Sequence, residues 1–400
     1  MMRTIVPVVV SVMFGVACSA ADGKPLKVFI LAGQSNMQGH MPVRTFESMA
    51  DDPKTTPLLK DMRDADRKPY VCQKVWISSI GCAGNDTTEQ TGKLTTGFGA
   101  NRENIGPEFT FGIYMEKLLG EPILIIKTSW GGKDLHTCFR SPSVGPYEWG
   151  DYEHQASKRR GDDMDKERAE KIKATGEYYR LMIEHVQKVL ADIKRVVPEY
   201  DPNQGYQVAG FVWFHGFNDL VSSWTYPDGE KPGAYDLYSR LLADFIRDVR
   251  KDLNAAKMPF VIGVMGLNGL NPPKNETVFH MAQAAPASLS EFRGNVAAVE
   301  TTPFWDDDLA SLQRRDVSLW KKQDAAAAEA QKKNPKLTGE EFQAAKDQVL
   351  FDNDFTPEDL KRCRRGVGDL LGYHYMGAAK ILAPIGKAFA EAMVELQKTR

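Results

Sequence analysis

The chain has 400 residues, of which 42% are hydrophobic and 26% are charged, and its formal net charge is −2. A chain of this length can bury a large core and form one elaborated α/β domain or two domains. The near-balance of charge leaves no global basic field, which argues against a nucleic-acid-binding protein.

Residues 1–20 are typical of a secretory signal, because a positive charge precedes an apolar run that is too short to span a bilayer. Small residues before Ala21 allow cleavage there, and lipoprotein processing at Cys18 is the less favoured alternative. We therefore expect a secreted or periplasmic mature protein, residues 21–400, with no other membrane-spanning segment.

The next apolar run ends abruptly at a glycine, and a serine follows. Residues 27–32 predict a buried parallel strand, and Gly33 allows a sharp turn after it. Ligands of open α/β sheets bind beyond the carboxyl ends of the strands, so this strand would place Ser35 where chemistry usually occurs. Residues 36–39 would open a helix or loop with free amide donors near the serine. Taken alone, the pattern also fits a serine that caps a helix.

The sequence Gly-Gln-Ser-Asn-Met-Gln-Gly at residues 33–39 resembles the first block of the SGNH hydrolases. It is most similar to the branch that holds sialate O-acetylesterases and the acetylxylan esterases of carbohydrate esterase family 6. The resemblance covers residues 26–305 and 366–397. It implies a flavodoxin-like three-layer α/β sandwich with a central parallel sheet, Ser35 as nucleophile, an acetylated carbohydrate substrate, and no metal or organic cofactor.

Strands and helices alternate along the chain, which by itself indicates a parallel sheet with helices on both faces. Two stretches interrupt the alternation: a charged excursion at 141–175, and a charged, alanine-rich, helix-prone insertion at 307–365 before the last block. We therefore expect one esterase domain with two additions. The predicted strands are 71–79, 122–126, 208–214, 260–265 and 295–299, the predicted helices are 109–119, 178–196, 235–253 and 376–397, and a glycine-rich loop is predicted at 81–104.

A serine nucleophile needs a base that accepts its proton, and His374 is our candidate. It lies just before the last predicted helix, and a doubly wound sheet would return this loop to the carboxyl edge. The segment also resembles the last block of the family, in which the catalytic histidine precedes the final helix. His215, which follows the strand 208–214, is the alternative base.

The acid that would orient the histidine is left open by the sequence. The family usually places an aspartate three residues before the catalytic histidine, where this chain has Leu371. Asp369 would need a different loop path, and Asp306 or Glu300 could approach from the edge of the sheet. A backbone carbonyl could also orient the ring, which would leave a Ser-His dyad.

Ester cleavage also needs donors for the developing oxyanion. The sequence Gly-x-Asn-Asp at 216–219 resembles the third family block, which implies that the side chain of Asn218 is a donor. Gly106 resembles the glycine of the second block, which implies a backbone donor; a glycine ahead of a proline-started helix is the alternative. The amide of Ser35 would be the third donor.

Gln34, Trp130 and His215 are candidates for lining the substrate pocket, although core packing is an equally good interpretation of Trp130. Together these features predict a secreted carbohydrate O-acetyl esterase that works through an acetyl-enzyme. A lipase or thioesterase on the same scaffold and a non-catalytic carbohydrate-binding relative are the alternatives. The sequence does not indicate the oligomeric state.

Four cysteines follow the signal: Cys72, Cys82, Cys138 and Cys363. An even number in an exported protein is compatible with disulfides, and Cys72 and Cys82 could close a short loop. Small buried hydrophobic residues are an equally good interpretation. The chain has no CxxC sequence and no Cys/His cluster at zinc-ligand spacing.

Overall fold

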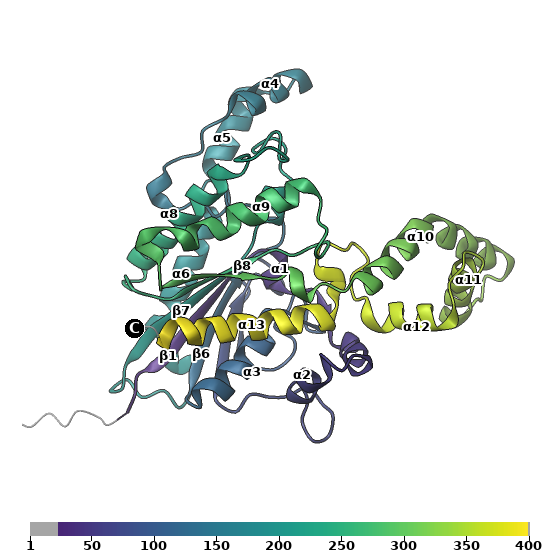
Figure 1. The fold of residues 1–400 in the computed structure, drawn as a ribbon, viewed down its shortest axis with the longest axis horizontal. Helices are drawn as coiled ribbons and strands as arrows, with labels where there is room; N and C mark the ends of the chain where they lie inside the picture. Colours follow the sequence, from purple (N-terminus) through teal and green to yellow (C-terminus); the bar gives the residue numbers. More distant parts are fainter. Residues whose placement is uncertain (1–22, 399–400) are drawn as a thin grey trace, which may run out of the picture.

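The computed structural model describes residues 23–398, so the predicted signal at 1–20 lies outside the described residues (Figure 1). A seven-stranded sheet forms the centre, in the order β4-β3-β6-β1-β7-β8-β9. All neighbouring strands are parallel except β4, which pairs antiparallel with β3 at one edge. The predicted α/β class with a central parallel sheet is confirmed.

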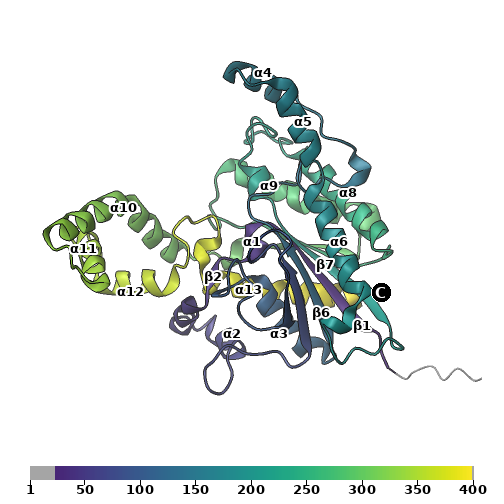
Figure 2. The ribbon, with the colours of Figure 1, turned by 180° about the vertical axis from the view of Figure 1, so that it is seen from behind.

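The sheet strands are β1 (Leu26–Gly33), β3 (Val75–Ile80), β4 (Gln90–Lys93), β6 (Ile123–Ser129), β7 (Tyr206–Phe214), β8 (Phe260–Val264) and β9 (Val296–Glu300). A separate two-stranded ribbon pairs β2 (Met41–Pro42) with β5 (Asn104–Ile105). Helices α3 (Pro107–Leu119) and α13 (Ala379–Lys398) pack against each other on one face of the sheet. The other face is covered by α6 (Glu177–Ala191), α8 (Asp236–Asp252) and α9 (Lys274–Ala284), which completes a three-layer sandwich (Figures 1 and 2).

Strand β1 lies at the centre of the core. Its residues 28–32 are completely buried, with β6 on one side and β7 on the other. A parallel strand that is covered on both faces has no solvent side, which explains the unbroken apolar run in the sequence. The register pairs Gly33 with both Ser129 and Phe214, so these three strands end at the same level. The loops that follow them therefore meet at one edge of the sheet.

The predicted strands and helices are all present, with shifted ends. The prediction of an uninterrupted loop over 81–104 is wrong, because this segment contains β4 and β5. Strand β4 has the sequence Gln-Thr-Gly-Lys and is only partly buried, as expected for an edge strand. It carries no apolar alternation, which is why the sequence gives no strand signal there.

Two helical projections leave the body of the protein (Figures 1 and 2). The first consists of α4 (Asp151–Arg160) and α5 (Met164–Ala174). The second, which we call the arm, consists of α10 (Asp307–Lys333), α11 (Gly339–Phe351) and α12 (Pro357–Gly366). Arg44 ties the arm to the body, because its guanidinium donates to the carbonyl oxygens of Arg364 and Val367 at 2.7 and 2.9 Å. The end of α12 is thereby held close to the start of the last loop.

Short helical segments complete the chain: α1 (Ser35–Gln38), α2 (Thr56–Asp61), α7 (Phe217–Leu220) and several 3-10 turns, including Val43–Asp51 and Tyr375–Gly377. Within residues 23–398 all four cysteines are free, and three of them are buried. The interpretation as small hydrophobic residues therefore holds in this structure. None of the helices between residues 23 and 398 combines the length and the hydrophobicity that a membrane crossing needs.

Candidate active site

The candidate nucleophile stands at the start of α1, directly after β1. The turn into α1 depends on Gly33, because a Cβ there would lie 2.1 Å from the carbonyl oxygen of Phe214. Ser35 is only 7% exposed. The first amides of a helix have no partner within the helix, so the amide of Ser35 can donate to a bound group.

Gln34 joins this turn to the loop after β7. Its Oε1 accepts from the amide of Gly216 at 2.9 Å, and its Nε2 donates to Oδ1 of Asn218 at 2.9 Å. Because the backbone N–H of Gly216 can only donate, the atom of Gln34 that faces it is the oxygen. Nε2 of Gln34 is therefore the donor to Asn218, and the atom of Asn218 that accepts is Oδ1. Nδ2 of Asn218 is thereby left to donate elsewhere, as an oxyanion donor requires. Gln34 itself is completely buried, and both ends of its amide are bonded to the loop after β7.

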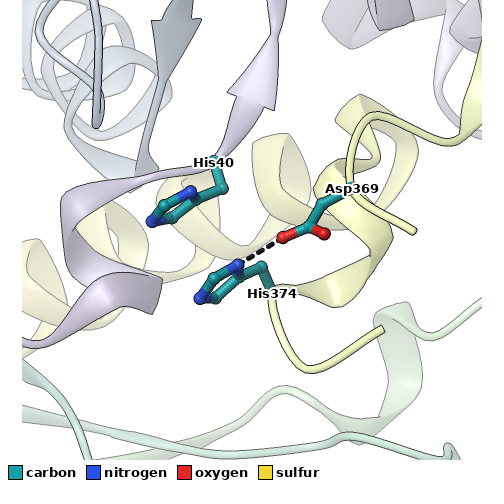
Figure 3. Close-up of side chains that lie close together, drawn as sticks. All are labelled: His40, Asp369 and His374. Atoms are coloured by element: carbon teal, nitrogen blue, oxygen red, sulfur yellow. Dashed lines mark hydrogen bonds and ion pairs between the residues drawn. The ribbon is translucent and has the colours of Figure 1, made fainter. Parts of the chain in front are cut away.

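The candidate base is paired with an acid. Nδ1 of His374 hydrogen-bonds to Oδ2 of Asp369 (Figure 3). The amides of Gly368 and Asp369 both donate to the carbonyl oxygen of Met376, at 2.7 and 2.9 Å, which folds the loop back on itself. The aspartate five residues before the histidine therefore reaches the ring. Burial raises the pKa of Asp369, but hydrogen bonds from His374 and the amide of Leu371 outweigh it and keep the pKa low.

The other two acids are placed elsewhere. Asp306 caps α10 by accepting from the amide of Leu309 at 2.9 Å, and it pairs with Lys380 at 2.7 Å. Glu300 is exposed at the end of β9, and among the described residues it has no hydrogen bond or ion pair with His374. Of the acids left open by the sequence, Asp369 is the one that meets the histidine.

The loop that carries His374 touches both segments around the nucleophile. The ring of Tyr373 stacks on Phe217, next to Asn218, with centroids 5.2 Å apart. The ring of His374 stacks on His40, five residues after Ser35. Asp369 bonds to Nδ1 of His374, so Nε2 is the ring nitrogen that remains available to the serine. Within residues 23–398 no hydrogen bond joins Ser35 Oγ to His374. Catalytic hydrogen bonds commonly tighten only when substrate binds.

A cavity of about 810 Å³ opens beside His40 and Asp369. His40 and Asp369 form part of its wall, and Asn101, Glu103 and Asn104 add polar groups. Concave sites with a few polar groups next to reactive side chains are the usual places for small ligands. Of the proposed site residues Asp369 lines this cavity, whereas Ser35, Asn218 and His374 do not, so the cavity is a candidate for ligand binding next to the reacting groups rather than around them.

A completely buried ion pair, Lys127 with Glu108, bonds to the turn that carries Ser35. Nζ of Lys127 donates to Oε2 of Glu108 at 2.7 Å and to the carbonyl oxygens of Gln38 and Phe98 at 2.8 and 2.7 Å. The amide of Gly106 donates to Oε1 of Glu108 at 2.8 Å. That amide therefore already has a partner in this structure, and the proposed reaction below does not use it as an oxyanion donor. A lysine inside the apolar strand β6 is the signal in the sequence from which this pair could have been predicted.

We expect Lys127→Met to lower the free energy of unfolding by about 3–5 kcal/mol, because it leaves the buried Glu108 carboxylate without its positively charged partner. Burial is the main cause that raises the pKa of Glu108, and Lys127 is the main group that opposes it. The double variant Lys127→Met/Glu108→Gln should recover part of the loss, since it buries no charge. Urea unfolding of the three proteins measures this. Equal stability of the single variant and the unmodified protein would contradict a supporting role.

His215 and Trp130 belong to the core. Burial lowers the pKa of His215 to about 4, and its Nε2 hydrogen-bonds to the carbonyl oxygen of Lys133 at 2.9 Å. Trp130 is 1% exposed, and its Nε1 donates to the carbonyl oxygen of Asp86 at 2.9 Å. Both side chains are therefore buried and bonded within the protein, and the bonded ring of His215 argues against it as the base.

Comparison with known proteins identifies the family. The family model described as "Carbohydrate esterase, sialic acid-specific acetylesterase" matches residues 25–310. The chain belongs to this family. The family is described as one of carbohydrate acetylesterases, which are carboxylic ester hydrolases. The matched region contains the whole sheet with Ser35 and Asn218, whereas Asp369 and His374 lie beyond it.

Several solved structures are similar to this esterase. A carbohydrate acetylesterase from Xanthomonas citri matches over 70% of this chain and 51% of its own, with 14% identity and a TM-score of 0.40. A protein from Arabidopsis thaliana matches over 69% and 86%, with 16% identity and a TM-score of 0.36. NanS matches over 70% and 78%, with 16% identity and a TM-score of 0.35. The match therefore spans about half the length of the Xanthomonas citri enzyme. None of the curated proteins matches this chain.

Proposed function

We propose that this esterase is exported and removes acetyl groups from a sugar or polysaccharide through an acetyl-enzyme. In this proposal Ser35 is the nucleophile, His374 the base and Asp369 the acid that orients it. The observation that carries the proposal is the Asp369–His374 pair. Its loop packs against both the segment after Ser35 and the segment with Asn218.

The proposed reaction has two halves. Ser35 Oγ bonds to the acetyl carbon while Nε2 of His374 takes the hydroxyl proton and the carbonyl electrons move to oxygen. The Ser35 amide and Nδ2 of Asn218 donate to this oxyanion. When the intermediate collapses, the sugar oxygen leaves and takes the proton from His374. Water, activated by the same imidazole, then attacks the acetyl-enzyme and releases acetate.

Asp369 acts on the ring rather than on the substrate. By accepting from Nδ1–H it selects the tautomer in which Nε2 has a free lone pair, and its charge stabilises the imidazolium that forms. Ser35 and Asn218 follow β1 and β7, which end at the same level of the sheet. The His374 loop comes from a third part of the chain and packs on both segments through His40 and Phe217.

The substrate range tests the proposal. We expect acetate release from acetylated xylan or from O-acetylated sialic acid, and a kcat/KM for octanoyl esters that is at least about 100-fold lower than for acetyl esters of the same alcohol. Ser35→Ala measures the background. A preference for octanoyl esters would instead favour a lipase or thioesterase on this scaffold.

Export is proposed from the signal-like residues 1–20 alone. The mature amino terminus, determined by mass spectrometry on protein from the periplasm or medium, is expected at Ala21. Full-length protein retained in the cytoplasm would contradict export and leave the proposed chemistry untouched.

A further inference from the structure

A second histidine lies against the proposed base. His40 follows α1, and its ring is parallel to that of His374: the ring centroids are 3.9 Å apart and the planes differ by 7° (Figure 3). The reaction described above uses His374 and Asp369 but gives no role to His40. His40 is also one of the residues that line the cavity.

The backbone holds His40 in this position. A Cβ on Gly39 would lie 2.1 Å from Cα of Gly106, and a Cβ on Gly377 would lie 2.5 Å from the carbonyl oxygen of His40. Both contacts are too close for any residue but glycine. The backbone of His40 therefore lies directly against the His374 loop, and the residue before it lies directly against Gly106.

The ring of His40 is uncharged at neutral pH and is not held by a hydrogen bond at Nε2. Burial, followed by the nearby charge of His374, lowers the pKa of His40 to about 4. Its Nε2 is buried and has no hydrogen-bond partner among residues 23–398. The contact of His40 with His374 is therefore made by the face of its ring.

We propose that His40 is a positioning residue, whose flat neutral ring fixes the plane of His374 so that Nε2 faces Ser35. The face of an aromatic ring also attracts a cation, so the same stack stabilises the imidazolium that forms when His374 takes the serine proton. This inference rests on the proposed function, because it needs His374 to be the base.

A metal site is the competing interpretation, since ligand atoms of His40, Asp369 and His374 all lie within 4.8 Å of one another. The stack argues against it. A ring nitrogen binds a metal along a lone pair in the plane of the ring, and the lone pairs of two parallel rings do not converge on one ion. The hydrogen bond to Asp369 also occupies Nδ1 of His374.

Three substitutions of His40 test the proposal, with an aryl acetate as substrate. His40→Phe keeps a flat uncharged ring and should retain at least about half of kcat. His40→Leu fills similar space without a ring face, and His40→Ala empties it; both should lower kcat about tenfold with KM changed less than about twofold. His280→Phe is the matched control and should leave kcat unchanged. His280 lies on α9, burial lowers its pKa to about 4, and its Nε2 is also buried without a partner among the described residues.

The outcomes separate the interpretations. Equal loss in His40→Phe and His40→Leu would overturn the proposal, because the nitrogens rather than the ring face would then matter. Inhibition of the unmodified enzyme by micromolar Zn²⁺ that His40→Phe abolishes would make His40 a metal ligand and would also overturn it. If His40→Ala does not fold, the kcat values of His40→Phe and His40→Leu still show whether the ring face is needed. Failure of the proposed function looks different, since the unmodified enzyme would then be no more active than Ser35→Ala.

Discussion

Ser35→Ala is expected to lower kcat for an aryl acetate by about 10⁴- to 10⁶-fold, because it removes the oxygen that forms the acetyl-enzyme. The residual rate would come from the oxyanion donors acting on water. The change removes one oxygen from a side chain that is 7% exposed, so little effect on folding is expected. Initial rates of phenol release and the thermal midpoint of unfolding measure the two effects separately.

Ser79→Ala is the matched control for this experiment. Ser79 is also buried, lies near the carboxyl end of β3, and its hydroxyl has no hydrogen-bond partner among residues 23–398. It should keep full activity. Comparable rates for Ser35→Ala and the unmodified enzyme would remove Ser35 from the reaction.

Asp369→Asn is expected to lower kcat by about 10³- to 10⁴-fold, the second largest effect. The amide keeps the size of the side chain but has no charge to stabilise the imidazolium. If it turns its NH₂ toward Nδ1, it also fixes the ring in the tautomer whose Nε2 carries a proton and cannot accept one. KM should change little, because Asp369 acts on the base. A kcat profile over pH, with an aryl acetate at saturation, measures the loss.

Asp306→Asn is the control for this prediction, because it shows whether the loss of another partly buried carboxylate also lowers kcat. Asp306 caps α10 and pairs with Lys380, so its loss should lower the thermal midpoint and leave kcat unchanged. A large fall in kcat for Asp306→Asn with none for Asp369→Asn would contradict the assignment of the acid.

The fold was predictable because its main signals are local. Residues 28–32 of β1 are apolar because both faces of the strand are covered, and the run in the sequence reports that burial directly. The position of Ser35 follows from the end of that run. Strand β4 was missed because an edge strand exposed to solvent needs no apolar pattern.

The pairing of Asp369 with His374 was open from the sequence because it depends on distant contacts. The turn directly after His374 needs positive φ at Tyr375 and Met376, 54° and 58°, which non-glycine residues rarely adopt. Its start is held by Arg44, more than three hundred residues earlier in the chain. No local pattern reports either condition.

Three candidates for the substrate pocket share one position in the fold. Gln34, Trp130 and His215 all follow strand ends at the edge where the active site lies, which is why each was a candidate for the pocket. In the structure each is at most 1% exposed, because neighbouring loops cover that edge. Proximity to a strand end can be inferred from sequence, whereas the direction of a side chain depends on the loops that pack against it.

The most direct test of the central claim is the reaction with a fluorophosphonate, mapped by mass spectrometry. The account predicts a single adduct on Ser35, formed at least about 100-fold more slowly in His374→Ala and at the unmodified rate in His215→Ala. An adduct on another residue, or equal labelling rates with and without the imidazole of His374, would contradict it.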